Sequence, residues 1–168
     1  AQITGTVTAL AAYVDVSDST TIPTPDSSAI IEVDLTSATI TFEGIIQNDI
    51  VYISDNIGFL YSYDLKENRI LWAKKNKVPF RSNLKLIGNI LITSNQNNEL
   101  LFYAKSDGNL LKSFPTEETK VKNQFKNNLA INGNKIFFIN TFGSLYSVDI
   151  ENKNLNWFIN LNQTNNVN

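Results

Sequence analysis

The sequence contains no cysteine and no histidine among its 168 residues. Without thiols there is no disulfide framework and no thiolate nucleophile, and without imidazole there is no histidine base or metal ligand. Most transition-metal sites and the Ser-His and Cys-His catalytic units are therefore excluded. Chemistry through carboxylates, lysine or tyrosine, and hard-cation binding through oxygen ligands, stays open.

Basic residues are missing from the first part of the chain. Residues 1–47 contain no Lys, Arg or Asn and six acidic residues, whereas residues 48–168 hold all 14 basic residues and ten acidic ones. The overall net charge of −2 is thus divided into a formal −6 and a formal +4. Such a step in composition marks a boundary between modules. The sequence predicts an acidic, β-rich N-terminal docking module over 1–47, with a single domain that has one acidic face as the alternative.

The N-terminal module alternates apolar and polar residues in three places, at 3–8, 31–35 and 38–43, which is typical of strands with one wet face. Residues 15–28 collect Ser, Thr, Asp and two prolines and predict a long loop. The apolar stretch 8–14 has no basic flank and is too short for a membrane span, so no direct membrane insertion is expected.

One strand of this module carries a motif. The residues Ala38-Thr39-Ile40-Thr41-Phe42-Glu43-Gly44, which follow a Thr/Ser-rich start, resemble a strand of small β-sandwich modules in tailed-phage virion proteins. The resemblance covers about 45 residues, which is less than an ordinary domain. It departs from the pattern after Gly44, where Ile45-Ile46-Gln47 replaces the expected Ser and Asp-Gly. It implies a place in a virion.

Internal self-similarity is the clearest pattern in the chain. Residues 50–72 align without gaps to residues 135–157. The identical pairs are Gly58/Gly143, Leu60/Leu145, Tyr61/Tyr146, Ser62/Ser147, Asp64/Asp149 and Trp72/Trp157. A middle copy begins near residue 90, and a period of about 40–45 residues is that of a four-stranded propeller blade.

Each copy predicts the same four strands. Three alternating strands are separated by Gly, Asn or Asp turns, and a fourth can be drawn upstream, at 39–45, 82–87 and 127–131. The predicted fold class is therefore all-β, with three antiparallel blade repeats at about 48–87, 88–131 and 132–168. Because propellers close with four or more blades, three blades form an incomplete propeller with uncovered edges.

The spacing from Tyr61 through Asp64 to Trp72, repeated from Tyr146 through Asp149 to Trp157, resembles the PQQ-like (quinoprotein-like) propeller repeat. That family includes alcohol dehydrogenases and the bacterial outer-membrane assembly lipoprotein. The resemblance implies blades joined in a ring. The middle copy departs from the pattern, because Asn98, Ala104 and Lys112 stand where Gly, Asp and Trp belong.

The repeat residues are expected to be structural. Trp72 and Trp157 can fill wedges between adjacent blades, and Asp64 and Asp149 end strands where carboxylates accept backbone N–H bonds. Three aspartates of the N-terminal loop lack the spacing of an EF-hand, and no phosphate loop or paired carboxylates are present. No catalytic, cofactor-binding or metal-binding residue is predicted. The structural repeat residues are Gly58, Tyr61, Asp64, Trp72, Gly143, Tyr146, Asp149 and Trp157.

A basic run, Lys74-Lys75-Asn76-Lys77 with Arg81 nearby, lies beside Trp72 and Phe80. Binding of an acidic surface and simple solvation of a turn both explain it, and the charge of the repeat module is too small to predict a nucleic-acid partner.

These observations predict a non-enzymatic structural or interaction protein without a cofactor, whose partners are other protein subunits. The leading expectation is a virion-associated phage component (decoration, tail or fibre) that assembles through its N-terminal module. The alternative is a fragment of a periplasmic or outer-membrane assembly scaffold with a PQQ-like propeller.

Overall fold

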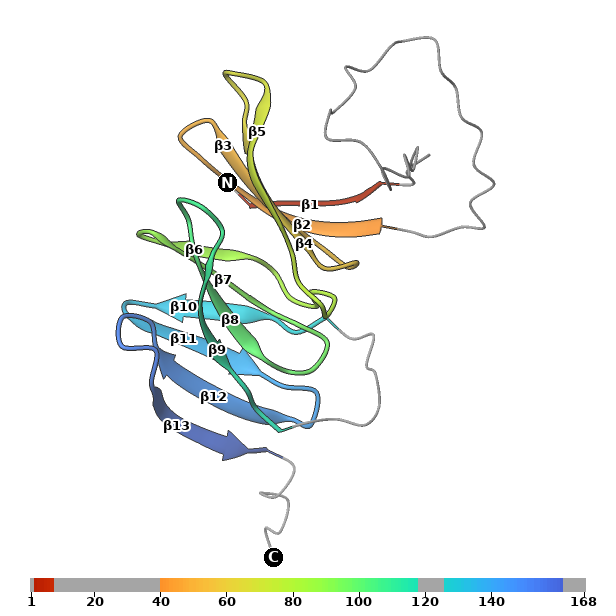
Figure 1. Ribbon diagram of the computed structural model, residues 1–168. Coiled ribbons are helices and arrows are strands. Elements are labelled where there is room, and N and C mark those ends of the chain that lie inside the picture. Colours follow the sequence, from red (N-terminus) through yellow and green to blue (C-terminus); the bar gives the residue numbers. More distant parts are fainter. Residues whose placement is uncertain (1, 8–39, 118–125, 162–168) are drawn as a thin grey trace, which may run out of the picture.

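Alternating strands and tight turns build three antiparallel sheets, one after another along the chain (Figure 1). The structure is a computed structural model that describes residues 2–7, 40–117 and 126–161. Every regular element in these ranges is a β-strand. The strands of the first sheet are β1 (Gln2–Val7), β2 (Ile40–Gln47), β3 (Ile50–Asp55), β4 (Phe59–Asp64) and β5 (Arg69–Lys75).

The second and third sheets have four strands each. The second consists of β6 (Lys85–Ile87), β7 (Ile90–Ser94), β8 (Leu100–Ala104) and β9 (Leu110–Phe114). The third consists of β10 (Leu129–Asn132), β11 (Lys135–Ile139), β12 (Ser144–Asp149) and β13 (Leu155–Asn160). Within each sheet, strands that follow one another in sequence are hydrogen-bonded neighbours. We refer to β2–β5, β6–β9 and β10–β13 as blades 1, 2 and 3.

The strands are joined by turns whose residues adopt left-handed backbone conformations. Asn48 and Asp49, between β2 and β3, have φ angles of 51° and 63°. Two successive positive φ angles are what a two-residue type I′ hairpin turn requires, and Asn and Asp tolerate them. This turn fixes the register of the first hairpin, in which Gln47 pairs with Ile50.

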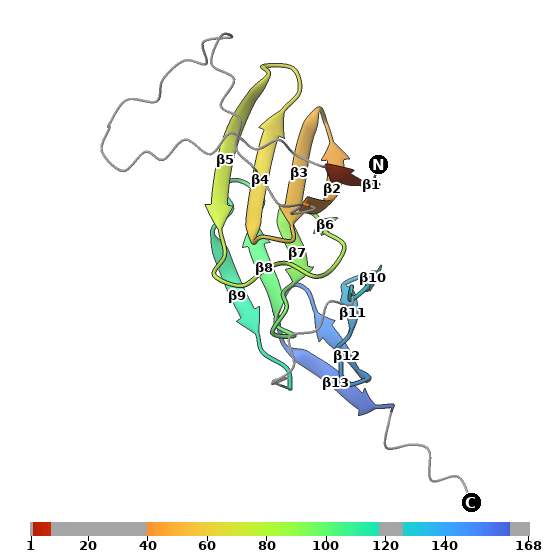
Figure 2. The same ribbon diagram turned by 90° about the vertical axis from the view of Figure 1, so that its right-hand side faces the viewer.

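The three blades stack face against face (Figures 1 and 2). We call the face of a blade that looks toward the next blade its forward face and the opposite one its rear face. Residues paired across antiparallel strands share a face. The forward face of blade 1 thus carries Tyr52, Ser62 and Trp72, which are aligned by the pairing of β3, β4 and β5.

Two apolar cores lie between the blades. The first joins Tyr52 and Leu60 of blade 1 to residues of blade 2 and the segment before it: Phe80, Leu84, Leu91, Leu101 and Tyr103. The second joins the opposite face of blade 2 to blade 3: Ile92, Leu100, Phe102, Leu129, Ile136, Phe138, Tyr146, Val148 and Ile150. Neighbouring strand residues point to opposite faces, so Leu91 serves one core and Ile92 the other. Blade 2 is covered on both sides.

The expected fold class is confirmed: the described residues form three sheets of blade type and contain no helix. The upstream strand drawn for each repeat is present as β2, β6 and β10. Each blade therefore begins a few residues before the predicted repeat boundary. The reason is that its first strand (β2, β6 or β10) lies upstream of the three strands in which the sequence repeats most clearly.

The N-terminal module contributes two strands to the first sheet. β1 pairs with β2 from Gln2 to Val7, and β2 pairs with β3. The step in composition near residue 47 coincides with the turn between β2 and β3. Separate roles for 1–47 and 48–168 stay a prediction, and the expected strand at 31–35, the proline-containing loop and its aspartates lie outside the described residues.

Candidate functional site

Trp72 sits at the interface between blades 1 and 2. Its indole Nε1–H donates a hydrogen bond to the backbone oxygen of Lys105, at 3.1 Å, in the turn between β8 and β9. Its ring lies 6.2 Å from that of Tyr52 on the same face of blade 1. The indole is therefore held both by its own blade and by the next one.

Gly108 makes room for this tryptophan. Its φ is +68°, and a Cβ there would lie 2.6 Å from both Cε3 and Cζ3 of Trp72. Such a distance is far below van der Waals contact, so any side chain at this position would push the indole away. Trp72 and Gly108 form one interlocking contact, although nothing in the sequence indicates that these two residues meet.

Trp157, the equivalent residue of blade 3, has no blade in front of it among the described residues. It packs on Phe137 of its own blade, with ring centroids 6.1 Å apart, and 41% of its surface is exposed. Its expected role as a wedge between blades stays a prediction, because no blade covers the forward face of blade 3 within residues 2–7, 40–117 and 126–161.

The repeat tyrosines Tyr61 and Tyr146 also differ in burial, and here the residue of blade 3 is the buried one. Tyr146 is buried in the second core, where it stacks on Phe158 and meets Phe114 of blade 2 edge-on. Burial raises the pKa of its hydroxyl. Tyr61 lies on the rear face of blade 1, half-buried and stacked on Phe59. No blade stands behind it in the described part of the chain.

The aspartates and glycines of the repeat shape turns. The carboxylate of Asp64 accepts hydrogen bonds from the backbone N–H groups of Lys66 and Glu67, and that of Asp149 accepts one from Asn152. Gly58 and Gly143 have φ angles of 97° and 79°. These residues therefore stabilise the turns that join the strands.

Asn98, which replaces the glycine in the middle repeat, connects blades 2 and 3. It is fully buried and has a φ of 63°, which asparagine tolerates better than most residues. Its Nδ2 donates to Thr141 Oγ1 at 2.8 Å, and its Oδ1 accepts from the Thr141 N–H at 3.2 Å. Sequence reasoning treated this residue only as a departure from the pattern. The signal was its residue type, since Asn combines a left-handed conformation with two hydrogen-bonding atoms.

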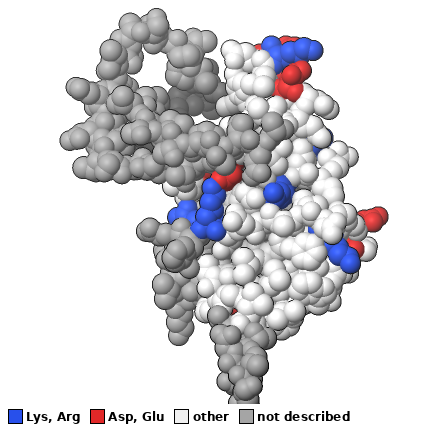
Figure 3. Space-filling view, turned by 180° about the vertical axis from the view of Figure 1, so that it is seen from behind, with Lys and Arg blue, Asp and Glu red and all other residues white. Residues whose placement is uncertain are grey.

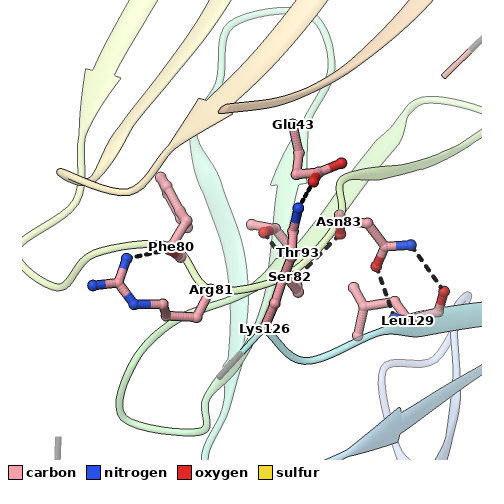
Figure 4. Close-up of polar contacts among 8 residues, drawn as sticks. All are labelled: Glu43, Phe80, Arg81, Ser82, Asn83, Thr93, Lys126 and Leu129. Atoms are coloured by element: carbon pink, nitrogen blue, oxygen red, sulfur yellow. Dashed lines mark hydrogen bonds and ion pairs between the residues drawn. The ribbon is translucent and has the colours of Figure 1, made fainter. Parts of the chain in front are cut away.

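Polar contacts also join the blades near their inner strands (Figure 4). Glu43 on β2 is buried and forms an ion pair with Lys126, which precedes β10. The side chain of Asn83 donates to the backbone oxygen of Leu129 at 3.3 Å and accepts from its N–H at 2.8 Å. Asn83 thus serves as the partner of an unpaired strand edge, and these contacts hold the inner strands together.

A cleft of about 450 Å³ opens between blades 1 and 2, at their outer strands. Its polar rim comes largely from one run of sequence, Lys74, Lys75, Asn76 and Lys77, with Asn109 from the facing turn. Its apolar wall consists of Leu60, Val78, Phe80, Tyr103 and Leu110. The basic run seen in the sequence therefore borders a concave site, although Arg81 is not part of its lining.

Glu99 lines the cleft beside Tyr103. Burial, and secondarily the nearby carboxylate of Glu99, raises the pKa of the Tyr103 hydroxyl, which is therefore protonated at neutral pH. On the rim, Lys74 Nζ donates to Asn109 Oδ1 at 2.9 Å. Lys75 pairs with Phe59 and its Nζ lies 5.2 Å from the centre of that ring, on the rear face of blade 1, so its charge points away from the cleft. With Lys74 and Lys77 against one glutamate, the cleft favours an anionic guest that also has apolar groups.

The interface between blades 2 and 3 is built from other residues. The residue of blade 2 that corresponds to Trp72 is Lys112, which is exposed, and the blade 2–blade 3 contact is made by the second core and Asn98. Among the described residues, no three Asp or Glu side chains gather into a metal-binding group. No helix in the described ranges is long and apolar enough to cross a membrane.

No family description and no curated protein matches the sequence. Solved structures do match. BamB from Moraxella catarrhalis superposes with a TM-score of 0.57 at 16% identity, over 67% of this chain and 34% of BamB. Quinohemoprotein alcohol dehydrogenase from Comamonas testosteroni gives 0.59 at 12% identity, over 69% of this chain and 20% of the enzyme. A europium-containing methanol dehydrogenase gives 0.58 at 11% identity, over 68% and 23%.

The fold is that of PQQ-type propeller blades. At these identities the likeness shows the fold alone. The chain spans about a third of the length of BamB and a smaller part of the dehydrogenases. The expected resemblance to PQQ-like repeats is thus confirmed at the level of fold, while none of these structures supports the resemblance to a phage virion module.

Proposed function

We propose that this chain is a non-enzymatic interaction module of a PQQ-like propeller, and that its inter-blade cleft receives an acidic, partly apolar segment of a partner protein. The observation that carries the proposal is the lining of the cleft, with Lys74 and Lys77 beside an apolar wall. Basic groups attract the segment and the wall buries its apolar side chains.

The position of the cleft suits an extended segment. Lys74 belongs to β5, the outer edge strand of blade 1, which is paired in the described structure on one side, with β4, and Lys77 follows two residues after the strand. An edge strand offers backbone hydrogen bonds to an added strand, and alternate side chains of that strand can enter the cleft. The guest would thus be bound both by its backbone and by its charge.

The described residues do not fit the calcium and quinone site that the resemblance to dehydrogenases implies. Such a site needs several oxygen ligands in one place, and these residues contain no group of three acidic side chains. Glu43, which is buried near the inner strands, is paired with Lys126. We therefore favour binding over catalysis.

The similarity to BamB and the edge strand together favour a scaffold at the periplasmic or outer-membrane face of a bacterial envelope over a virion component. Nucleic acid is a poor candidate partner, because charges of both signs are few and interspersed on the face seen in Figure 3. The proposed partner is a protein.

A peptide-binding measurement tests the cleft. The probe is a fluorescein-labelled peptide of alternating acidic and aliphatic residues, read by fluorescence anisotropy at low and at high salt. The double variant Lys74→Glu and Lys77→Glu should weaken binding at least about tenfold, which corresponds to about 1.4 kcal/mol. The matched control is Lys66→Glu with Lys135→Glu, two exposed lysines outside the cleft that change the net charge equally.

Equal loss of affinity in both double variants would show non-specific charge attraction and contradict the proposal. So would undiminished binding by the cleft variant. The non-enzymatic part is tested separately: reconstitution with Ca²⁺ and PQQ, followed by a dye-reduction assay with primary alcohols, should give no turnover above that of the free cofactor. Turnover that depends on the protein would overturn it.

A further inference from the structure

The hydroxyl of Tyr103 is a polar group in the cleft that the protein itself does not satisfy. The side chain lies on the rear face of blade 2, and only 5% of its surface is exposed. Its ring meets Phe80 edge-on, with centroids 6.2 Å apart. Within residues 2–7, 40–117 and 126–161 the hydroxyl forms no hydrogen bond, although the residue lines the cleft between blades 1 and 2. Because buried polar groups are normally hydrogen-bonded, this hydroxyl points to a guest group that meets it.

The other two blades treat the same position of the repeat differently. In blade 1 it is Tyr63, whose hydroxyl donates a hydrogen bond to the side chain of Asn68 in the turn that follows. In blade 3 it is Val148, which has no polar side-chain atom. In blade 2 the residue at the position of Asn68 is Gly108, which has no side chain to accept such a bond. Of the three blades, only blade 2 therefore presents a hydroxyl here that is left for a guest.

A nearby carboxylate limits which group this hydroxyl can bind. Glu99 lines the same cleft, and its two oxygens accept hydrogen bonds from Asn95 Nδ2 and from Ser113 Oγ, the latter at 3.3 Å. Burial first, and then the charge of Glu99, raises the pKa of the Tyr103 hydroxyl, so this group is a hydrogen-bond donor at neutral pH. A guest carboxylate beside it would be repelled by Glu99. The oxygen that accepts from Tyr103 must therefore be neutral.

The apolar wall restricts the shape of the neutral group. Tyr103 is the cross-strand neighbour of Leu110 and packs with Leu60 and Phe80, and all three line the cleft. A side chain that enters here must present mostly apolar surface. An amide brings two N–H donors, which an apolar wall leaves unpaired, whereas a hydroxyl brings one O–H group. Threonine fits best, because it is β-branched like valine and adds a single oxygen.

We propose that the cleft recognises a threonine of its guest, whose side-chain oxygen accepts a hydrogen bond from the Tyr103 hydroxyl, while acidic residues of the guest lie beside Lys74 and Lys77. This inference rests on the proposed function and makes it more specific. In an extended guest of alternating acidic and aliphatic residues, threonine stands at one of the aliphatic positions, because those side chains share the face that enters the cleft.

Fluorescein-labelled peptides that alternate Glu and Val provide the test, read by fluorescence anisotropy. Each Val is replaced in turn by Thr, and every peptide is measured with the wild-type chain and with Tyr103→Phe. At one position Thr should raise the affinity for the wild type about threefold to tenfold, the range of a single hydrogen bond. The gain should vanish in Tyr103→Phe, because the hydroxyl and the threonine then form a coupled pair in a double-mutant cycle.

Tyr63→Phe is the matched control. It removes the hydroxyl at the same repeat position of blade 1, which is bonded to Asn68 and lies outside the lining of the cleft. The gain from threonine should be unchanged in this variant. Urea unfolding supplies a second readout: Tyr103→Phe should unfold at the urea concentration of the wild type or above it, because it removes a hydroxyl without a partner in the protein.

Equal affinities for the Val and Thr peptides, or a gain that persists in Tyr103→Phe, would overturn the inference. If such peptides still bind and the double variant Lys74→Glu with Lys77→Glu weakens them, the acidic-segment function stands without it. Failure of every peptide to bind would overturn both. A Tyr103→Phe chain that unfolds at lower urea than the wild type, or does not fold, would show that the hydroxyl is bonded within the protein, and this too would overturn the inference.

Discussion

The substitution Gly108→Ala tests the interlock between blades 1 and 2. The added methyl group would lie 2.6 Å from the Trp72 ring and 2.9 Å from Lys74 Cγ, at a backbone φ of +68°. A left-handed conformation costs a residue with a Cβ about 1–2 kcal/mol. Overpacking adds about 1–3 kcal/mol. Together these estimates predict that the free energy of unfolding falls by about 2–5 kcal/mol.

Gly133→Ala is the matched control. Gly133 also has a positive φ, of 56°, but nothing lies within 4 Å of the position that its Cβ would occupy. Only the conformational cost of about 1–2 kcal/mol should appear. The difference between the two variants therefore measures the crowding against Trp72.

Urea unfolding followed by circular dichroism provides the two free energies, with an unchanged slope as the sign that only stability has changed. If the crowding is against Trp72, the extra loss at position 108 should shrink in a Trp72→Leu background, since residues in contact are not additive. Equal losses for Gly108→Ala and Gly133→Ala would refute the interlock.

Three further predictions concern single residues. Trp72→Ala should lower the free energy of unfolding by about 3 kcal/mol, the lower end for a tryptophan in a core. Trp157→Ala should lower it by about 1 kcal/mol, because Trp157 is exposed. Equal losses for the two variants in urea titrations would contradict this difference. Asn98→Gly, although it restores the repeat pattern, should destabilise by about 1–3 kcal/mol because it removes the hydrogen bonds to Thr141, and a stabilised variant would show the bridge to be unimportant. Hydrogen bonds from Asn140 and Ser144 lower the pKa of the Glu117 carboxyl. The ionised carboxylate therefore stabilises the fold at pH values above the ordinary glutamate pKa of about 4.3, and this contribution is lost as the pH falls through the lowered pKa. Glu117→Gln should therefore melt at a lower temperature than the wild type at neutral pH and at the same temperature in acid, and a gap that persists in acid would argue against the charge.

The sequence was sufficient for the number and kind of blades. Strand periodicity, turn residues and the repeated pairs such as Tyr61/Tyr146 depend on local geometry, in which a two-residue alternation and a left-handed turn are visible from neighbours alone. The same local logic located the inner strands β2, β6 and β10 as upstream segments. It also placed the basic run 74–77, though not the cleft that it borders.

Residues at the same position of the repeat do not have the same environment in the folded protein. Trp72 and Trp157 occupy the same position of the repeat, yet Trp72 packs against Gly108 and Trp157 is exposed. Tyr61 and Tyr146 also share a repeat position, and here the residue of blade 3 is the buried one. The reason is that a blade face acquires its burial from the neighbouring blade, a contact between residues tens of positions apart that no local pattern encodes. The sequence alone determined which residues could face a neighbouring blade, and only the stacking of three blades decided which of them have one.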